Sequence, residues 1–155
     1  MARLVAIEAR GQAFVDGLLR AWDAGDAVLP VDPRLPRAAA DRLLGAMAID
    51  EPVAPDVALV VATSVELTHS QTAASARATS SFLGIEPARH RWLACLPLAH
   101  VGGLSVVTRA HHSGTPLVVH EGFDAAAVDS AAREAGCTHV SLVATAMARV
   151  DTTAW

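Results

Sequence analysis

Val57-Ala-Leu-Val-Val-Ala-Thr-Ser-Val-Glu-Leu-Thr-His-Ser-Gln71 is the stretch that decides the fold of this chain. Its first part, 57–62, is a continuous apolar and β-branched run, which predicts a strand covered on both faces, as in a parallel sheet. Its last part matches a capping box, in which the Thr68 hydroxyl and the Gln71 side chain each satisfy a free amide. We therefore predict that a strand leads directly into a helix, which runs to Leu83 and ends at Gly84.

The same alternation of strands and helices continues on both sides of this stretch. Apolar runs predict further strands at 27–31, 92–96, 116–120 and 138–142. Helical spacing and capping residues predict helices at about 14–22, 36–47, 103–112, 124–136 and 144–150. Repeated units of this kind predict an α/β domain with a largely parallel sheet.

Length and composition exclude several classes of protein. A chain of 155 residues suffices for one compact domain. It has no apolar run near the roughly 20 residues that cross a bilayer and no secretory signal, so we expect a cytoplasmic protein without a membrane segment. A net charge of −4 without a basic stripe argues against a nucleic-acid partner. Cys95 and Cys137 lie in apolar surroundings and are expected to be buried free thiols.

The basic residues are unusual because all 12 are arginine. The chain therefore has no lysine ammonium to offer to a phosphate or a carboxylate.

Four segments in order resemble the adenylate-forming acid–CoA ligases. The first, 21–36, has the general pattern of that family. The second, Ala58 to His69, is similar to the two flanks of the family's phosphate-binding loop. Leu96-Pro-Leu-Ala-His-Val-Gly-Gly-Leu104 resembles the next motif, and Val140-Ser-Leu-Val-Ala-Thr-Ala-Met-Ala-Arg149 the one after it. Within the superfamily, the sequence around His100 is most like the o-succinylbenzoate–CoA ligases of menaquinone synthesis.

This resemblance implies a two-step ligase reaction. A small carboxylic acid attacks the α-phosphate of ATP–Mg²⁺ to give an acyl-adenylate, and CoA then displaces AMP to give a thioester. A Gly/Ser/Thr loop with a lysine would hold the triphosphate. The resemblance also implies that residues 1–155 are part of an N-terminal AMP-binding domain, without the later segments that bind adenine and ribose.

The resemblance assigns site residues by position in these motifs. Thr63 and Ser64 would contact the ATP phosphates. The acid pocket would be lined by His100, Gly102, Gly103, Ser105 and Thr145. No catalytic residue and no metal ligand is assigned.

The chain departs from the family between Ser64 and Val65, where the glycines and the lysine of the loop are absent. Two explanations are open: the sequence omits a mobile loop, which the intact flanks favour, or the protein lacks the loop and its ATP chemistry. In either case we predict no ligase activity for these 155 residues alone.

Two other functional classes remain. A loop-deleted, non-catalytic relative would serve as a binding or assembly module, and a partial domain could also form homo-oligomers. A metal-dependent hydrolase would use His111, His112 and His120, but adjacent helical side chains diverge and no further ligand stands at a suitable spacing.

Overall fold

The computed structural model describes residues 1–61 and 64–155, apart from the side chain of residue 154. The chain divides into two compact units, Met1–Thr72 and Ala73–Trp155. Each unit has its own sheet, and the two are described in turn. Among the described helices, none is long and apolar enough to cross a membrane.

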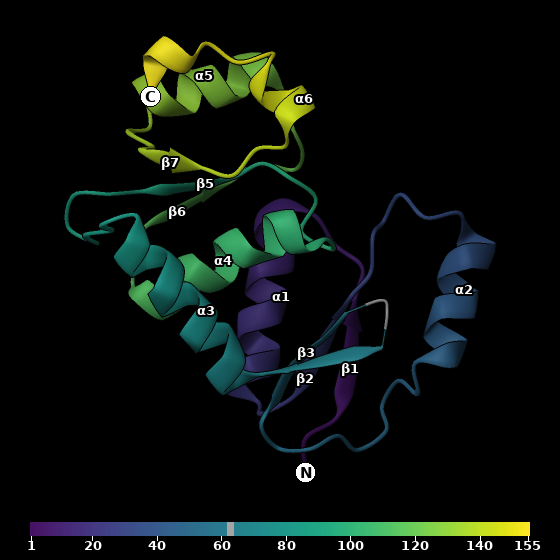
Figure 1. Ribbon diagram of the computed structural model, residues 1–155. Coiled ribbons are helices and arrows are strands. Elements are labelled where there is room, and N and C mark those ends of the chain that lie inside the picture. The colour runs from purple at the N-terminus through teal and green to yellow at the C-terminus, as the bar shows by residue number, and fades with distance from the viewer. Residues whose placement is uncertain (62–63) are drawn as a thin grey trace. The chain divides into compact units, whose positions relative to one another are not determined.

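The first unit is built on a four-stranded sheet (Figure 1). Its elements are β1 (Leu4–Ile7), α1 (Gly11–Asp23), β2 (Ala27–Pro30), α2 (Arg37–Ala46), β3 (Val57–Val61), β4 (Val65–Thr68) and the start of α3 (His69–Phe82). The strand order is β1-β2-β3-β4. The first three strands are parallel, whereas β4 is antiparallel to β3. The sheet is therefore largely parallel, as the alternation of strands and helices predicts.

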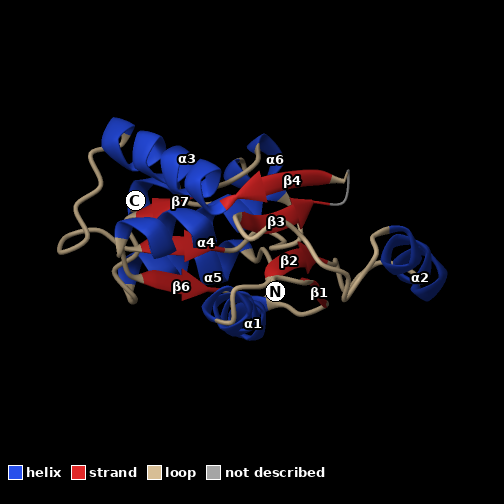
Figure 2. Cartoon of the chain, turned by 90° about the horizontal axis from the view of Figure 1, so that it is seen from below, coloured by secondary structure: helices blue, strands red, loops and turns tan. Residues whose placement is uncertain are grey.

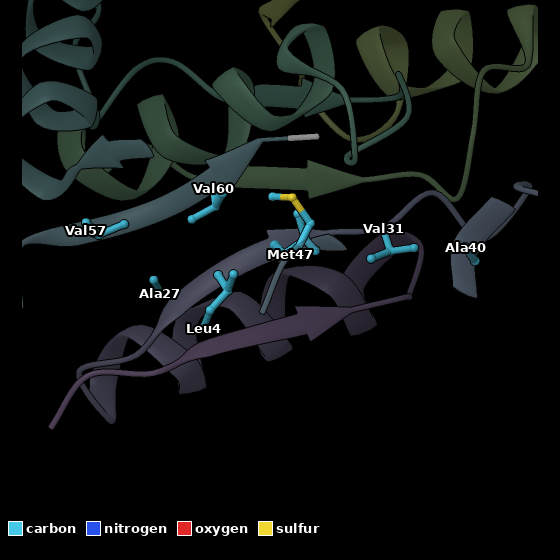
Figure 3. Packing of buried hydrophobic residues seen from close by; sticks show 8 residues of the cluster. Leu4, Ala27, Val31, Ala40, Met47, Val57 and Val60 are labelled. Atoms are coloured by element: carbon cyan, nitrogen blue, oxygen red, sulfur yellow. The ribbon is translucent and has the colours of Figure 1, made fainter. Parts of the chain in front are cut away.

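The core of the first unit gathers side chains from the strands and from α2 (Figure 3). Leu4, Val57 and Val60 are buried on the strands, and Ala40 joins them from α2. Met47, at the end of α2, completes the cluster. The continuous apolar run of β3 is thus explained by burial, since Val57 through Val60 are all buried.

The predicted direct passage from strand to helix is wrong, because β4 lies between them. Val65 pairs with Val61, so β3 and β4 form a hairpin with only residues 62 to 64 between the paired positions. The predicted capping box is confirmed at the end of β4. The Gln71 amide donates to Thr68 Oγ1 at 3.1 Å, and the Thr68 amide donates to Gln71 Oε1 at 2.9 Å.

The second unit contains a three-stranded parallel sheet in the order β6-β5-β7 (Figure 2). Its elements after α3 are β5 (Trp92–Ala94), α4 (Val101–Ser113), β6 (Leu117–Val119), α5 (Ala125–Arg133), β7 (His139–Val140), α6 (Ala144–Met147) and a 3₁₀ turn (Thr152–Ala154). Helices α4 and α5 lie on opposite faces of this sheet. Asp124 caps α5, as predicted, by accepting a hydrogen bond from the Ala127 amide.

The core of the second unit lies between β5 and α5. Leu93 and Cys95 pack with Val128 and Ala131 of α5, and Cys137 belongs to the same cluster. Both cysteines are buried and free, which confirms the prediction. Burial raises the pKa of the Cys95 thiol to about 11, so this thiol is unreactive near neutral pH.

Candidate functional site

The hairpin between β3 and β4 stands where the phosphate-binding residues are predicted. Thr63 lies outside the described residues. Ser64 is exposed and has a left-handed backbone, with φ at 61°, and its amide donates to the Val61 carbonyl at 2.8 Å. Its hydroxyl contacts Met47 Sδ at 3.6 Å. Left-handed backbone is unfavourable for a residue with a side chain, by about 1–2 kcal/mol.

The described residues of this hairpin do not fit a triphosphate with its Mg²⁺. Such a group needs several free backbone amides and a cation. The Ser64 amide is already bonded within the hairpin, and the sequence contains no lysine. No phosphate-binding step is therefore derived from this segment.

The other predicted site residues belong to the second unit, and most of them lie at the start of α4. His100 occupies the N-cap position, where its carbonyl accepts the amides of Gly103 at 3.1 Å and Leu104 at 2.9 Å. The His100 side chain is exposed and does not cap the helix. Gly102, Gly103 and Ser105 follow in the first turns, so the structure brings these four positions together.

Gly103 is required by close packing of the backbone. A Cβ atom there would lie 2.5 Å from the carbonyl oxygens of both Leu96 and Pro97. At Gly102 the nearest atom would be Leu96 Cδ1 at 3.4 Å, an ordinary contact. Gly103 therefore allows the backbone of Leu96 and Pro97 to pass close to the first turn of α4.

Ser105 leads to a residue that the sequence motifs did not single out, Arg109. The guanidinium of Arg109 donates from Nη2 to Ser105 Oγ and from Nη1 to Ser141 Oγ, both at 3.1 Å. Ser105 Oγ in turn donates to the Gly102 carbonyl at 3.5 Å. Arg109 also lies over the Trp92 ring, 5.5 Å from its centre. The cluster thus joins α4, β5 and the segment after β7.

Among the described residues, no acidic side chain balances the charge of Arg109. No carboxylate lies in ion-pair contact with it in the part of the chain that the structure describes. Burial lowers the pKa of its guanidinium, because the surroundings disfavour the charge. The two serines use two of its five N–H donors, which leaves enough for a bidentate carboxylate. A half-buried cation with free donors is suited to bind an anion.

A signal for Arg109 is present in the sequence but is weak. Helix α4 is apolar over most of its length and contains no acidic residue. An arginine in such a helix has no acidic partner three or four residues away on the same helix. Ser141, the second hydroxyl, lies 32 residues further along the chain and could not be paired with it by spacing.

Two remaining sets of predicted residues do not join this cluster. Thr145 is exposed on α6, and its role in a pocket remains a prediction. The rings of His111 and His112 contact each other at 5.1 Å. Among the described residues, no three His, Cys, Asp or Glu side chains are grouped so that they could hold a metal ion.

Several known proteins are similar to this chain in sequence. No family model matches the chain. The probable 2-succinylbenzoate–CoA ligase of Mycobacterium tuberculosis is 34% identical over 125 residues, which cover 72% of this chain and 32% of the relative. The 2-succinylbenzoate–CoA ligase of Bacillus licheniformis is 36% identical over 74 residues, 47% of this chain and 16% of the relative. This chain resembles the 2-succinylbenzoate–CoA ligases. The resemblance that the motifs predicted is thereby confirmed.

Solved structures match the fold over nearly the whole chain. The o-succinylbenzoate coenzyme A synthetase of Bacillus subtilis in complex with AMP has a TM-score of 0.77 at 20% identity, covering 94% of this chain and 50% of that one. The N-terminal domain of FACL13 from Mycobacterium tuberculosis has a TM-score of 0.73 at 19% identity, covering 95% and 51%. The chain therefore has the α/β fold predicted from the family. It spans about a third of the length of the 2-succinylbenzoate–CoA ligase from M. tuberculosis.

Proposed function

We propose that this chain is the acid-recognising part of an ATP-dependent acid–CoA ligase that acts on 2-succinylbenzoate, in menaquinone biosynthesis. The observation that carries the proposal is Arg109, which lies half-buried between two serine hydroxyls and has no carboxylate partner in the described part of the chain. The sequence similarity to 2-succinylbenzoate–CoA ligases supports the choice of acid.

The chemistry of this acid suits an arginine that has no acidic partner among the described residues. 2-Succinylbenzoate carries two carboxylates, and an acid–CoA ligase activates only one of them. The other keeps its charge throughout the reaction and needs a fixed cation in a partly desolvated site. A planar guanidinium binds a carboxylate through two parallel hydrogen bonds, which fixes orientation as well as charge. In this proposal Arg109 binds the carboxylate that does not react.

The residues predicted from the motifs take supporting roles. His100, Gly102, Gly103 and Ser105 lie at the start of α4, about one to two and a half turns before Arg109. We propose that they line the acid pocket together with Thr145. We also keep Thr63 and Ser64 as the positions nearest to the phosphates in the complete enzyme.

The complete reaction belongs to a longer protein in this proposal. ATP–Mg²⁺ would supply the AMP leaving group and CoA the thiol, as the solved relatives with ATP and magnesium and with a CoA product analogue indicate for their own chains. The described residues of the β3–β4 hairpin, together with the absence of lysine, provide no binding site for the triphosphate in these 155 residues. We therefore expect these 155 residues to bind the acid in the cytoplasm but not to form the adenylate.

A second candidate is a non-catalytic binding or assembly module, alone or as a homo-oligomer. The pairing of Val61 with Val65 favours it, because only three residues separate them where the family has its phosphate loop. The two candidates differ in the length of the natural protein. An intact mass equal to that of the 155-residue sequence supports the module, and a larger mass supports the ligase.

The proposal is tested by calorimetric titration of the chain with 2-succinylbenzoate. We expect stoichiometric binding that weakens about tenfold or more in Arg109→Lys, since one amine cannot replace the guanidinium fork. Arg133→Lys, an exposed arginine that pairs with Asp151, is the matched control and should bind as the wild type does. Equal affinities of Arg109→Lys and wild type would show that the acid binds elsewhere.

A further inference from the structure

A row of ring contacts extends from the surface of the second unit to Arg109. The rings of His90 and His139 lie with centres 4.9 Å apart, and those of His139 and Trp92 lie 5.2 Å apart. The Arg109 guanidinium is 5.5 Å from the centre of the Trp92 ring. We propose that Trp92 is a positioning residue that holds the plane of the Arg109 guanidinium, and that His139 and His90 hold the Trp92 ring in turn.

Arg109 needs such support because its hydroxyl partners fix only its ends. Ser105 and Ser141 each accept one hydrogen bond from a different terminal nitrogen. An aromatic face beneath the guanidinium attracts the charge and restricts rotation of its plane. A fixed plane determines the direction from which a carboxylate can bind with two hydrogen bonds.

Tryptophan at position 92 buries an indole N–H, and the contact with the Arg109 cation explains why tryptophan is nevertheless found there. Trp92 is only 2% exposed, and its indole N–H has no hydrogen-bond partner among the described residues. A buried indole N–H usually finds a partner. A phenylalanine would fill this space without burying an unpaired donor. Tryptophan, however, offers the aromatic face that attracts cations most strongly.

The two histidines next to Trp92 each make a hydrogen bond through Nδ1. His90 Nδ1 accepts a hydrogen bond from the Glu86 amide at 2.8 Å. His139 Nδ1 lies 2.9 Å from Thr138 Oγ1. Burial, and then the neighbouring His90, lower the pKa of His139, which disfavours a second cation beside the Trp92 ring. Packing of His139 against Trp92, and of His90 against His139, therefore supports the position of the Trp92 ring.

The inference is tested first without any ligand, by the NMR signal of the Arg109 Nε–H group in a chain labelled with ¹⁵N-arginine. The signal is assigned by its loss in Arg109→Lys. We expect a ring-current shift in the wild type, a smaller shift in Trp92→Phe, and no shift in Trp92→Leu. His139→Gln should reduce the shift, because the Trp92 ring loses its neighbour. Trp155→Phe is the matched control in the same unit and should leave the signal in place.

Two results would overturn the inference. One is an unchanged Arg109 signal in folded Trp92→Leu, and the other is an equal change in Trp155→Phe. If Trp92→Leu does not fold, Trp92→Phe and His139→Gln decide, and unchanged signals in both refute the role of Trp92.

A second measurement connects this inference to the proposed function, on which its ligand rests. The affinity for 2-succinylbenzoate should fall about threefold in Trp92→Phe and about tenfold in Trp92→Leu, with unchanged stoichiometry. If the wild type does not bind the acid, the proposed function fails, whereas the NMR signal still judges the positioning of Arg109. If the acid binds and Trp92→Phe and Trp92→Leu bind it as tightly as wild type, the positioning role is refuted.

Discussion

Arg109 on α4 and Ser141 beyond β7 are joined by a 3.1 Å hydrogen bond that connects a helix to the far edge of its sheet. The guanidinium is therefore held by two parts of the chain. Ser105 lies on α4, and Ser141 lies in the segment after β7. A guanidinium fixed by two hydrogen bonds is preorganised for a ligand. Loss of either hydrogen bond should therefore lower the affinity for 2-succinylbenzoate.

We predict that Ser141→Ala weakens binding of 2-succinylbenzoate about fivefold to tenfold. The variant loses one hydrogen bond to a charged group, and Arg109 gains freedom that the ligand must then restrict. Calorimetric titration measures the change. Ser130→Ala removes a hydroxyl that bonds to exposed Glu134 and should have no effect on affinity.

Gly103→Ala should lower the free energy of unfolding by about 2–3 kcal/mol, because a methyl group cannot fit against two carbonyl oxygens and the backbone must shift. Urea unfolding measures the loss. Gly102→Ala, one residue earlier in the same turn, meets only an ordinary contact and should change stability by less than about 1 kcal/mol. Similar losses in both variants would contradict the packing that we describe at Gly103.

Ser64→Gly should raise the free energy of unfolding by about 0.5–1 kcal/mol. Glycine removes the penalty of the left-handed backbone, which exceeds the entropy that it adds to the unfolded chain. Ser75→Gly makes the same change in the exposed middle of α3 and should instead destabilise the chain by about 0.5 kcal/mol. A loss of stability in both variants would show that Ser64 is not strained.

Stability should fall in mild acid because of His139. Burial, and then the neighbouring His90, lower the pKa of His139 below its usual value of 6.5. The unfolded chain therefore binds a proton before the folded chain does. We expect the melting temperature to be constant above about pH 7 and to fall as the pH drops below about 6.5, until His139 is protonated in the folded state. His139→Gln should flatten this decline, and His111→Gln, at an exposed helix position, should preserve it.

The fold could be predicted wherever burial leaves a mark in the sequence. The run 57–60 is apolar without interruption because β3 is buried, and this pattern identified the strand. Strand β4 was missed because its four residues are partly exposed and are recruited by pairing with β3, which no local pattern encodes. Strand β1 is as short, and its place depends on β2 in the same way.

The candidate site was predictable only in part for a similar reason. His100, Gly102 and Gly103 are adjacent in the sequence and form a motif. Arg109 is distinguished by what surrounds it, which is a hydroxyl from a distant segment and an aromatic ring. These relationships exist only in the folded chain.

The hairpin between β3 and β4 has a consequence for how nucleotide binding could be gained or lost. Val61 and Val65 are paired across it, so the sheet is already complete on both sides of the turn. Lengthening a loop whose ends are fixed in this way costs only about 1 kcal/mol for roughly eight added residues. A glycine- and lysine-bearing segment can therefore be inserted into or removed from the turn between β3 and β4 without refolding the sheet. ATP chemistry is thus separable from the part of the chain that carries Arg109.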